Sequence, residues 1–345
     1  MITAAQVKQC ALESGADIVG IGDIQLFEGA PTDFDPRYIF PEAKTIIGLG
    51  FRVHRGSYRG IEEGTFFAAL PSMGYANIND VFAPMCLQDV GDFLEDNGHE
   101  AVLYQNTSIR CGANRGRPVQ EGFPRPDVFI HFRIAAYICG MGEIGWSKVF
   151  LTPRFGPRQR FAFILTDAEL ETDSLMAPGT LCDRCKQCVR DCPVGAISAG
   201  RAVTINIGGH EIQWGELDVD RCSAGHQAAT AELNPFMTPE VAEGVEKLRT
   251  MPPGPERDAM VREFGGPWGL GRKLPYTQAT WDSFHHPGTI CGARGCQRAC
   301  FMHLEERGVL ENKFHRPFRQ RKPWKLDPSP TRVPSGPTTV EDGES

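Results

Sequence analysis

Hydrophobic and polar positions along the first half of the chain predict both helices and strands. Residues 3–15 have helical spacing, and the short apolar runs 16–22 and 45–51 are typical of buried strands. Residues 77–97 carry apolar side chains at near-helical spacing and end at an Asn-Gly pair, which favours a helix end there. A strand over 99–104 follows this helix.

The pattern continues with a short helix over 130–139 and two strands over 148–152 and 160–166, which we expect to pair through the connection PRFGPRQ. Helices and strands in this order fit an α+β domain of the α/β type. Beyond residue 167 the pattern changes. Val241, Val245 and Leu248 predict one short amphipathic helix, and the tail from residue 316 is proline-rich and polar.

Length and charge limit the possible functions. The 345 residues are enough for roughly two domains. The net charge of −7 gives no general attraction to nucleic acid or to an anionic membrane. The most apolar region, 128–142, is interrupted by His131 and Arg133, and the N-terminus shows neither a signal-peptide pattern nor a twin-arginine pair. We expect a cytoplasmic protein outside the membrane, whose spaced cysteines bind metal rather than form disulfides.

Eight of the twelve cysteines form a pattern typical of iron–sulfur ligation. The segment CDRCKQCVRDCP (182–193) has the spacing of bacterial ferredoxins. In those proteins three thiolates hold one [4Fe–4S] cluster and the fourth thiolate ligates the other cluster. By this rule the first cluster is assigned to Cys182, Cys185, Cys188 and Cys300, and the second to Cys192, Cys222, Cys291 and Cys296.

Two alternatives remain open for these cysteines. Zinc also accepts four thiolates, although this spacing is crowded for a zinc site. A single cluster with a few structural cysteines is possible as well, because four residues separate Cys291 from Cys296 and Phe301 stands where ferredoxins have proline. The remaining thiols lack ligand spacing and are expected to be buried: Cys10, Cys86, Cys111 and Cys139.

Three segments together resemble a known superfamily. They are CGMGEIG (139–145), LTPRFGPRQRFAFILTD (151–167) and CDRCKQCVRDCPVGAI (182–197). In combination they are similar to the corrinoid-dependent reductases, which comprise the reductive dehalogenases and the epoxyqueuosine reductases. The likeness extends over about residues 15–305.

The resemblance implies a domain organisation and a set of cofactors. It implies a nitroreductase-like domain over 1–170 that binds base-off cobalamin. A ferredoxin-like domain with two [4Fe–4S] clusters follows over 171–312, with an insertion at 223–290, and 313–345 form an extended or disordered tail. The clusters would reduce cobalt to Co(I), which then cleaves a bond of a small organic substrate.

Reductive cleavage needs a proton donor and a cation beside the reacting bond. In the dehalogenase branch a tyrosine donates the proton and a lysine or arginine about sixty residues later assists it. Tyr75 and Arg133, 58 positions apart, match this arrangement. The alternatives are a core tyrosine with a satisfied hydroxyl and a buried ion-pair partner. Tyr137 is a weaker alternative donor, and His131 and Asp127 flank the site.

Further residues are candidates for cofactor binding. Arg158 and Arg160 would contact amides of cobalamin, a phosphate or a substrate carboxylate, or else lie on a solvated hairpin face. Gly140, Gly142 and Gly145 would allow a flat ring to approach the backbone. A dinucleotide fingerprint is not expected here, because no clear strand precedes these glycines.

Three functions therefore compete. The first is a cytoplasmic reductase of the dehalogenase type that acts on a small molecule and takes electrons from reduced ferredoxin, flavodoxin or a reductase. The second is an epoxyqueuosine-type tRNA reductase, which the acidic composition disfavours. The third is a two-cluster electron carrier, which would not need some 180 residues ahead of its clusters.

Overall fold

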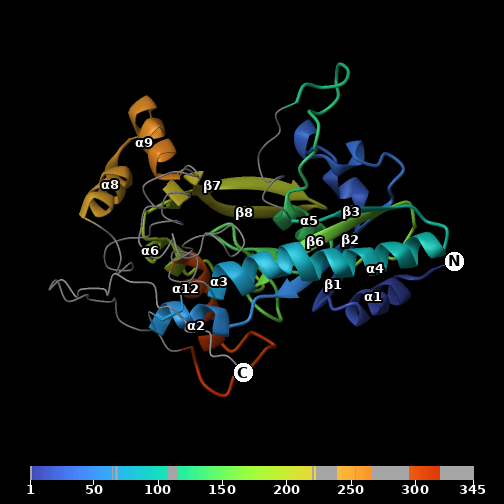
Figure 1. Ribbon diagram of the computed structural model, residues 1–345, viewed down its shortest axis with the longest axis horizontal. Helices are drawn as coiled ribbons and strands as arrows, with labels where there is room; N and C mark the ends of the chain where they lie inside the picture. The colour runs from blue at the N-terminus through green and yellow to red at the C-terminus, as the bar shows by residue number, and fades with distance from the viewer. Residues whose placement is uncertain are drawn as a thin grey trace, which may run out of the picture.

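The computed structural model describes residues 2–63, 65–66, 69–106, 116–219, 221–222, 239–252, 254–265 and 295–318. Its centre is a four-stranded antiparallel sheet with the strand order β1-β2-β6-β3 (Figure 1). The strands are β1 (Ile18–Asp23), β2 (Thr45–Arg52), β3 (Ala101–Tyr104) and β6 (Gln159–Thr166). A mixed α/β protein, as the alternating pattern predicts, is therefore confirmed.

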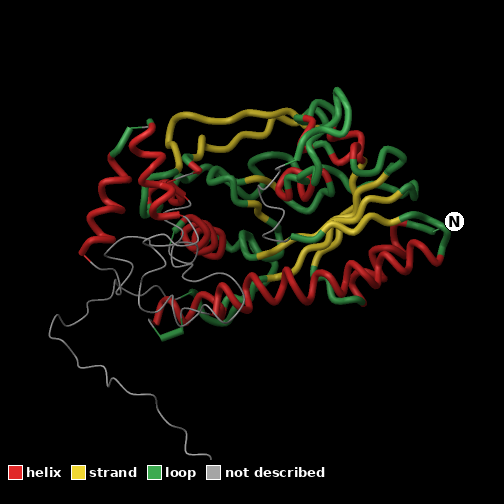
Figure 2. Tube along the Cα trace, turned by 45° about the horizontal axis from the view of Figure 1, so that its top comes forward, coloured by secondary structure: helices red, strands yellow, loops and turns green. Residues whose placement is uncertain are grey.

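Helices cover both faces of this sheet (Figure 2). Ile47 and Leu49 of β2 point to one face and pack with α1 (Ala4–Glu13) and α4 (Ala83–Asp96). Ile46 points to the other face, where α5 (Phe132–Ile138) lies. Because successive side chains of a strand point to opposite sides, the all-apolar run of β2 supplies two cores at once.

The helix predicted over 77–97 is confirmed but begins earlier. It runs without a break from α3 (Ala69–Pro71) through two π-helical segments, η4 (Ser72–Ala76) and η5 (Ile78–Phe82), into α4. Tyr75 lies in η4. A π-helical turn widens the helix locally and is frequent at functional sites, because it changes the direction of one side chain.

The predicted pairing of 148–152 with 160–166 is wrong. The first segment forms β5 (Phe150–Leu151), which pairs with β4 (Glu143–Ile144). The second is β6, whose side chains are buried on both faces, so it takes β2 and β3 as its two neighbours. Reciprocal hydrogen bonds between Thr152 and Gly156 turn the connecting loop away from a simple hairpin.

The second half of the chain contains mostly helices and one long hairpin. Strands β7 (Ile197–Ile207) and β8 (His210–Leu217) meet at Gly208 and Gly209, whose φ angles of 56° and 81° suit the tight turn. Their apolar side chains pack on the α5 side of the sheet. The helices there are α6 (Gln187–Arg190), α8 (Pro239–Thr250), α9 (Pro255–Gly265) and α12 (Cys296–Glu306).

The helix predicted around Val245 is confirmed as α8, whereas α9 and the β7–β8 hairpin were not predicted. The short helix η1 (Ile24–Phe27) follows β1, and α2 (Gly56–Glu63) follows β2. None of the described helices is long and apolar enough to cross a bilayer. Cys111, Cys291, the insertion segments 223–238 and 266–290, and the tail from 319 lie outside the described residues.

Candidate active site

Four thiols meet where α12 packs against α6 and the loop before it. Cys182, Cys185 and Cys188 come from this loop and α6, and Cys300 comes from α12. Burial and the neighbouring thiolates of Cys182, Cys188, Cys296 and Cys185 raise the pKa of Cys300. Thiols that repel one another when ionised become stable thiolates on binding a metal. The four cysteines that the ferredoxin spacing assigns to the first cluster therefore lie near one another, and Cys296 of the second predicted set is also a neighbour of Cys300.

A second group of thiols adjoins the first. Burial and the thiolates of Cys222, Cys192 and Cys188 raise the pKa of Cys296 to about 12. Burial and Cys192 likewise raise the pKa of Cys222. The fourth predicted ligand, Cys291, lies outside the described residues. Because Cys188 interacts with Cys296, the two groups are neighbours, as electron transfer between two clusters requires.

Backbone N–H groups already point at two of these sulfur atoms. The N–H of Trp146 donates to Sγ of Cys182 at 3.3 Å, and the N–H of Ala196 donates to Sγ of Cys192 at 3.2 Å. Hydrogen bonds to cluster sulfurs stabilise their negative charge and help to set the reduction potential. The donor set and its surroundings therefore fit [4Fe–4S] clusters.

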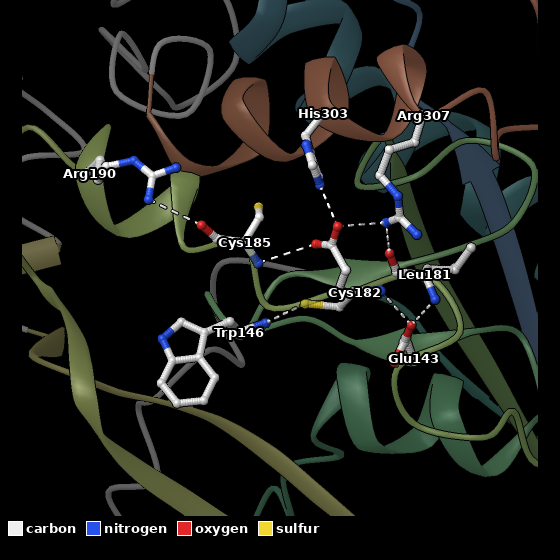
Figure 3. A network of polar contacts seen from close by, with 9 residues as sticks. Glu143, Trp146, Leu181, Cys182, Cys185, Arg190, His303 and Arg307 are labelled. Atoms are coloured by element: carbon white, nitrogen blue, oxygen red, sulfur yellow. Dashed lines mark hydrogen bonds and ion pairs between the residues drawn. The ribbon is translucent and has the colours of Figure 1, made fainter.

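One buried carboxylate holds the loop that carries the first ligands (Figure 3). Glu143 on β4 is 3% exposed. Its Oε2 accepts the N–H of Gly179 at 2.7 Å, and its Oε1 accepts the N–H groups of Leu181 and Cys182, the latter at 2.7 Å. Glu143 thereby joins the glycine-rich turn at 139–145 to the beginning of the cysteine motif.

A polar network surrounds the same loop on its other side. Oδ2 of Asp183 lies 2.8 Å from Nε2 of His303 and 3.5 Å from Nη1 of Arg307, and its Oδ1 accepts the N–H of Cys185 at 3.2 Å (Figure 3). Ligand atoms of Asp183, Cys185 and His303 lie within 4.8 Å of one another. His303 is on α12 and Arg307 directly follows it, so the carboxylate of Asp183 ties this helix to the cysteine loop.

Replacing Glu143 by glutamine is expected to weaken this loop. The amide has one acceptor atom where the carboxylate has two, so at least one buried N–H group loses its partner. Charge-assisted hydrogen bonds contribute about 1.5–3 kcal/mol each, so we expect the melting temperature to fall by several degrees and part of the iron to be lost. The exposed Glu169, 3.4 Å from Lys44, provides the control variant Glu169→Gln, which should change neither. Full iron content and an unchanged melting temperature in Glu143→Gln would contradict the role.

A cavity of about 270 Å³ lies beside the second thiol group. It is bounded by the start of α5, the start of β6 and the first turn of α12, where Gln297 follows Cys296. Its walls combine aromatic rings with amide and cationic groups: Phe129, Phe132, Phe150, Phe161, Asn106, Gln159, Gln297, His131, Arg133 and Arg160. Apolar walls with a few converging polar groups are typical of a small-molecule site.

Arg133 projects into this cavity from the first turn of α5. Its side chain is exposed. The surrounding protein nevertheless removes water from its guanidinium, and this loss of solvation together with the charge of Arg160 lowers the pKa of the group. Tyr75, Cys296 and Cys222 are the groups whose negative charge would raise that pKa. Arg133 therefore lies near both the tyrosine and the second thiol group. No carboxylate pairs with it among the residues that the structure describes.

Arg160 connects the two predicted catalytic residues. Its guanidinium lies over the ring of Tyr75, 4.4 Å from the ring centroid, and its Nε donates to Oδ1 of Asn79 at 3.1 Å. Tyr75 itself does not line the cavity, whereas Arg160 does. The structure thus brings Tyr75, Arg160 and Arg133 together at one end of the sheet.

Other predicted candidates lie away from this cavity or already form hydrogen bonds within the protein. The hydroxyl of Tyr137 donates to the carbonyl of Met176 at 2.8 Å and lies 2.6 Å from Nδ1 of His210, as in a satisfied core tyrosine. Asp127 is exposed and lines a different cavity with Tyr38. His131 lines the cavity of Arg133, and burial together with Lys148 lowers its pKa to about 4.

Arg158 is separated from Arg160. It is 1% exposed, donates to the carbonyl of Val53 at 2.8 Å and to Oδ1 of Asn312 at 2.9 Å, and does not line the cavity of Arg133. A solvated hairpin face is therefore wrong for this residue.

The three glycines approach the protein's own chain. A Cβ at Gly142 would lie 1.9 Å from the carbonyl oxygen of Leu151, and one at Gly140 would lie 2.7 Å from that of Ser174. Gly145 is packed against Leu151. Close packing of this turn accounts for all three glycines.

Two polar residues near the site were not predicted. Tyr58 is buried on α2 and its hydroxyl donates to Oε1 of Gln297 at 3.4 Å. Burial and the nearby Tyr75 raise the pKa of Tyr58 well above its usual range. Gln297 directly follows a predicted ligand, which is a usable signal, but nothing in the sequence around Tyr58 indicates its place.

The thiols expected to be buried outside the clusters are found so for Cys86 and Cys139, while Cys10 is half-buried.

No family model matches the chain. A curated relative is the tetrachloroethene reductive dehalogenase of Desulfitobacterium hafniense, which is 43% identical over 61 residues, or 17% of this chain and 11% of that protein. The resemblance to reductive dehalogenases is confirmed over this stretch. The match spans about a tenth of the relative's length.

Two solved structures are similar in outline. One is a reductive dehalogenase whose structure suggests a mechanism for B12-dependent dehalogenation, with a TM-score of 0.46 and 18% identity, covering 75% of this chain and 36% of that one. The other is an epoxyqueuosine reductase with an epoxyqueuosine-modified tRNA stem loop, with a TM-score of 0.44 and 15% identity, covering 88% of this chain and 82% of that one.

Proposed function

We propose that this chain is a corrinoid- and iron–sulfur-dependent reductase of the dehalogenase type that cleaves a bond in a small organic substrate. One observation carries the proposal. Two adjoining groups of cysteines lie next to a cavity whose wall presents Arg133 and Arg160, with Tyr75 beneath Arg160. An electron store, a cationic wall and a proton donor are the parts that reductive cleavage requires.

In this proposal two [4Fe–4S] clusters supply the electrons. Cys182, Cys185, Cys188 and Cys300 hold the first cluster, and Cys192, Cys222, Cys291 and Cys296 hold the second. Because Arg133 interacts with Cys222 and Cys296, the second cluster is the one beside the cavity. The first would receive electrons from reduced ferredoxin, flavodoxin or a reductase in the cytoplasm.

The cavity fits one edge of a corrinoid in its chemistry. Phe132 and Phe161 offer apolar surface to a corrin ring, and Gln297, whose Oε1 accepts from the hydroxyl of Tyr58, presents its amide at the wall. A corrinoid is larger than about 270 Å³, so only part of it would lie within these walls together with a small substrate. Bound base-off cobalamin would supply a strongly reducing cobalt centre. Residues 1–170 would form its nitroreductase-like domain and 171–312 the ferredoxin-like domain.

The chain's own residues handle charge and protons. Cleavage of a C–X bond consumes two electrons and one proton and yields C–H and the anion X⁻. Tyr75 donates the proton, and the cationic Arg160 above its ring stabilises the tyrosinate that is left behind. Arg133, without a carboxylate partner among the described residues, is available to stabilise the departing anion. Asp127, which was expected to flank the site, lines a different cavity and has no part in this proposal.

Metal analysis of protein purified without oxygen tests the proposal. We expect about eight iron atoms and one cobalt atom per chain. Cys296→Ser should lose about half of the iron, whereas Cys10→Ser, at a half-buried thiol outside both groups, should keep all of it. Zinc in place of iron would refute the cluster assignment, and iron without cobalt would refute the corrinoid.

A further inference from the structure

A second cavity of about 320 Å³ lies next to the first, and His131 lines both. Three segments form it: the loop around η1, the first turn of α5, and the β7–β8 hairpin. Its walls are mostly apolar and include Leu26, Phe27, Ile134, Ile207 and Trp214. The role proposed above does not use this cavity.

One cationic side chain, that of Lys148, lies among these apolar walls. Lys148 lines the cavity, and its Nζ lies 5.1 Å from the centroid of the Trp214 ring. The backbone of Lys148 has a φ of 62°, in the left-handed region that favours glycine, and its N–H closes a turn onto the carbonyl of Gly145 at 2.8 Å. A lysine at such a position is strained, and strain of this kind is common where a side chain has a function.

The charge that acts on Lys148 is positive. Burial and the charge of Arg133 lower its pKa, and no carboxylate raises it. Among the described residues Lys148 forms no ion pair. Glu28 lines the same cavity but is exposed and does not bond to Lys148. A half-buried ammonium with cationic neighbours is stabilised when an anion binds beside it.

His131 completes the polar side of the cavity. Its Nδ1 accepts the N–H of Ile134 at 3.4 Å, so the neutral ring carries its proton on Nε2. His131 therefore carries one hydrogen-bond donor, and the residue lines both cavities. The polar end of the cavity thus carries two hydrogen-bond donors, Lys148 and His131. No acidic side chain pairs with Lys148 among the described residues, so this end favours a ligand that accepts hydrogen bonds.

We propose that the second cavity binds a small organic acid, whose apolar body lies against Trp214 and Ile134 and whose anionic group pairs with Lys148. This inference goes beyond the proposed function, since the second cavity is not the one in which the reaction is proposed, and the ligands it names are apolar carboxylates or phenolates. The apolar walls exclude inorganic anions as good ligands, and the cationic end distinguishes an acid from its neutral analogue.

Binding of 1-naphthoate and of its neutral analogue 1-naphthamide tests this assignment. Equilibrium dialysis would use the full chain, purified without oxygen with its metal centres. We expect the acid to bind at least tenfold more tightly than the amide. Lys148→Gln should remove this preference and Lys148→Arg should keep most of it. Lys44→Gln, at an exposed lysine, should leave it unchanged.

A further variant separates binding from folding. Lys148→Gly relieves the left-handed backbone, so it should raise the melting temperature while losing the preference for the acid. A fall in melting temperature together with weaker binding would indicate that Lys148 is structural and would overturn the proposal. Equal binding of acid and amide by the unaltered protein would overturn it too.

A bound corrinoid also carries an apolar base and a phosphate, so its tail is the competing occupant. Protein loaded with cobinamide, which lacks this tail, should bind 1-naphthoate as well as protein loaded with cobalamin does. Binding only to the cobinamide form would assign the cavity to the cofactor tail and refute the acid site. If the protein holds no cobalt but Lys148 still selects the acid, the corrinoid function fails and the acid site stands.

Discussion

Tyr75→Phe is expected to lower turnover by about 10²–10⁴-fold while iron and cobalt contents stay unchanged. The variant removes only the hydroxyl that would donate the proton. The ring remains, so Arg160 can still lie over it and Asn79 can still accept from Arg160. Single-turnover reduction with a strong chemical reductant is the suitable measurement, because it does not depend on the electron donor.

Two tyrosines provide matched controls for this variant. Tyr137→Phe removes a hydroxyl bonded to Met176 and His210 away from the cavity, so turnover should change little. Tyr58→Phe removes the hydroxyl that donates to Gln297, the closest competing donor. If Tyr58→Phe abolished turnover and Tyr75→Phe did not, the donor role would belong to Tyr58.

The central elements of the fold could be predicted from the sequence because their signals are local. The apolar runs of β1 and β2 and the helical spacing of α4 depend on neighbouring residues only. Which strands pair is not local. Strand β6 takes β2 and β3 rather than the adjacent β5, since a strand buried on both faces belongs in the middle of a sheet.

The candidate site likewise has features that local sequence predicts and features that depend on distant residues. Cys182, Cys185 and Cys188 lie within seven residues, so their grouping follows from spacing alone. The role of Glu143 could not be predicted, because the N–H groups it binds come 36 to 39 residues later. The hairpin β7–β8 was missed although Gly208-Gly209 between apolar runs is a recognised turn signal. The strained backbone of Lys148 has no signal in the sequence at all.

Glu62→Gln is expected to destabilise the folded protein by about 3–5 kcal/mol, the usual result of removing one partner from a buried ion pair. Oε1 of Glu62 on α2 lies 2.8 Å from Nη1 of Arg298 on α12, with exposures of 0% and 6%. The melting temperature should fall by roughly 6–10 °C. The double variant Glu62→Gln/Arg298→Met removes the orphaned charge and should regain much of this loss.

The same variant should affect the metal centres, because Arg298 lies between Cys296 and Cys300 and so between ligands of both proposed clusters. Weakening the contact of α2 with α12 is expected to lower the iron content during purification. Glu63→Gln is the control, since Glu63 lies 3.6 Å from Arg59 on a partly exposed surface and the variant should change the melting temperature little. A melting temperature of Glu62→Gln close to that of Glu63→Gln would show that the buried ion pair has no part in holding α12 or in presenting its thiols.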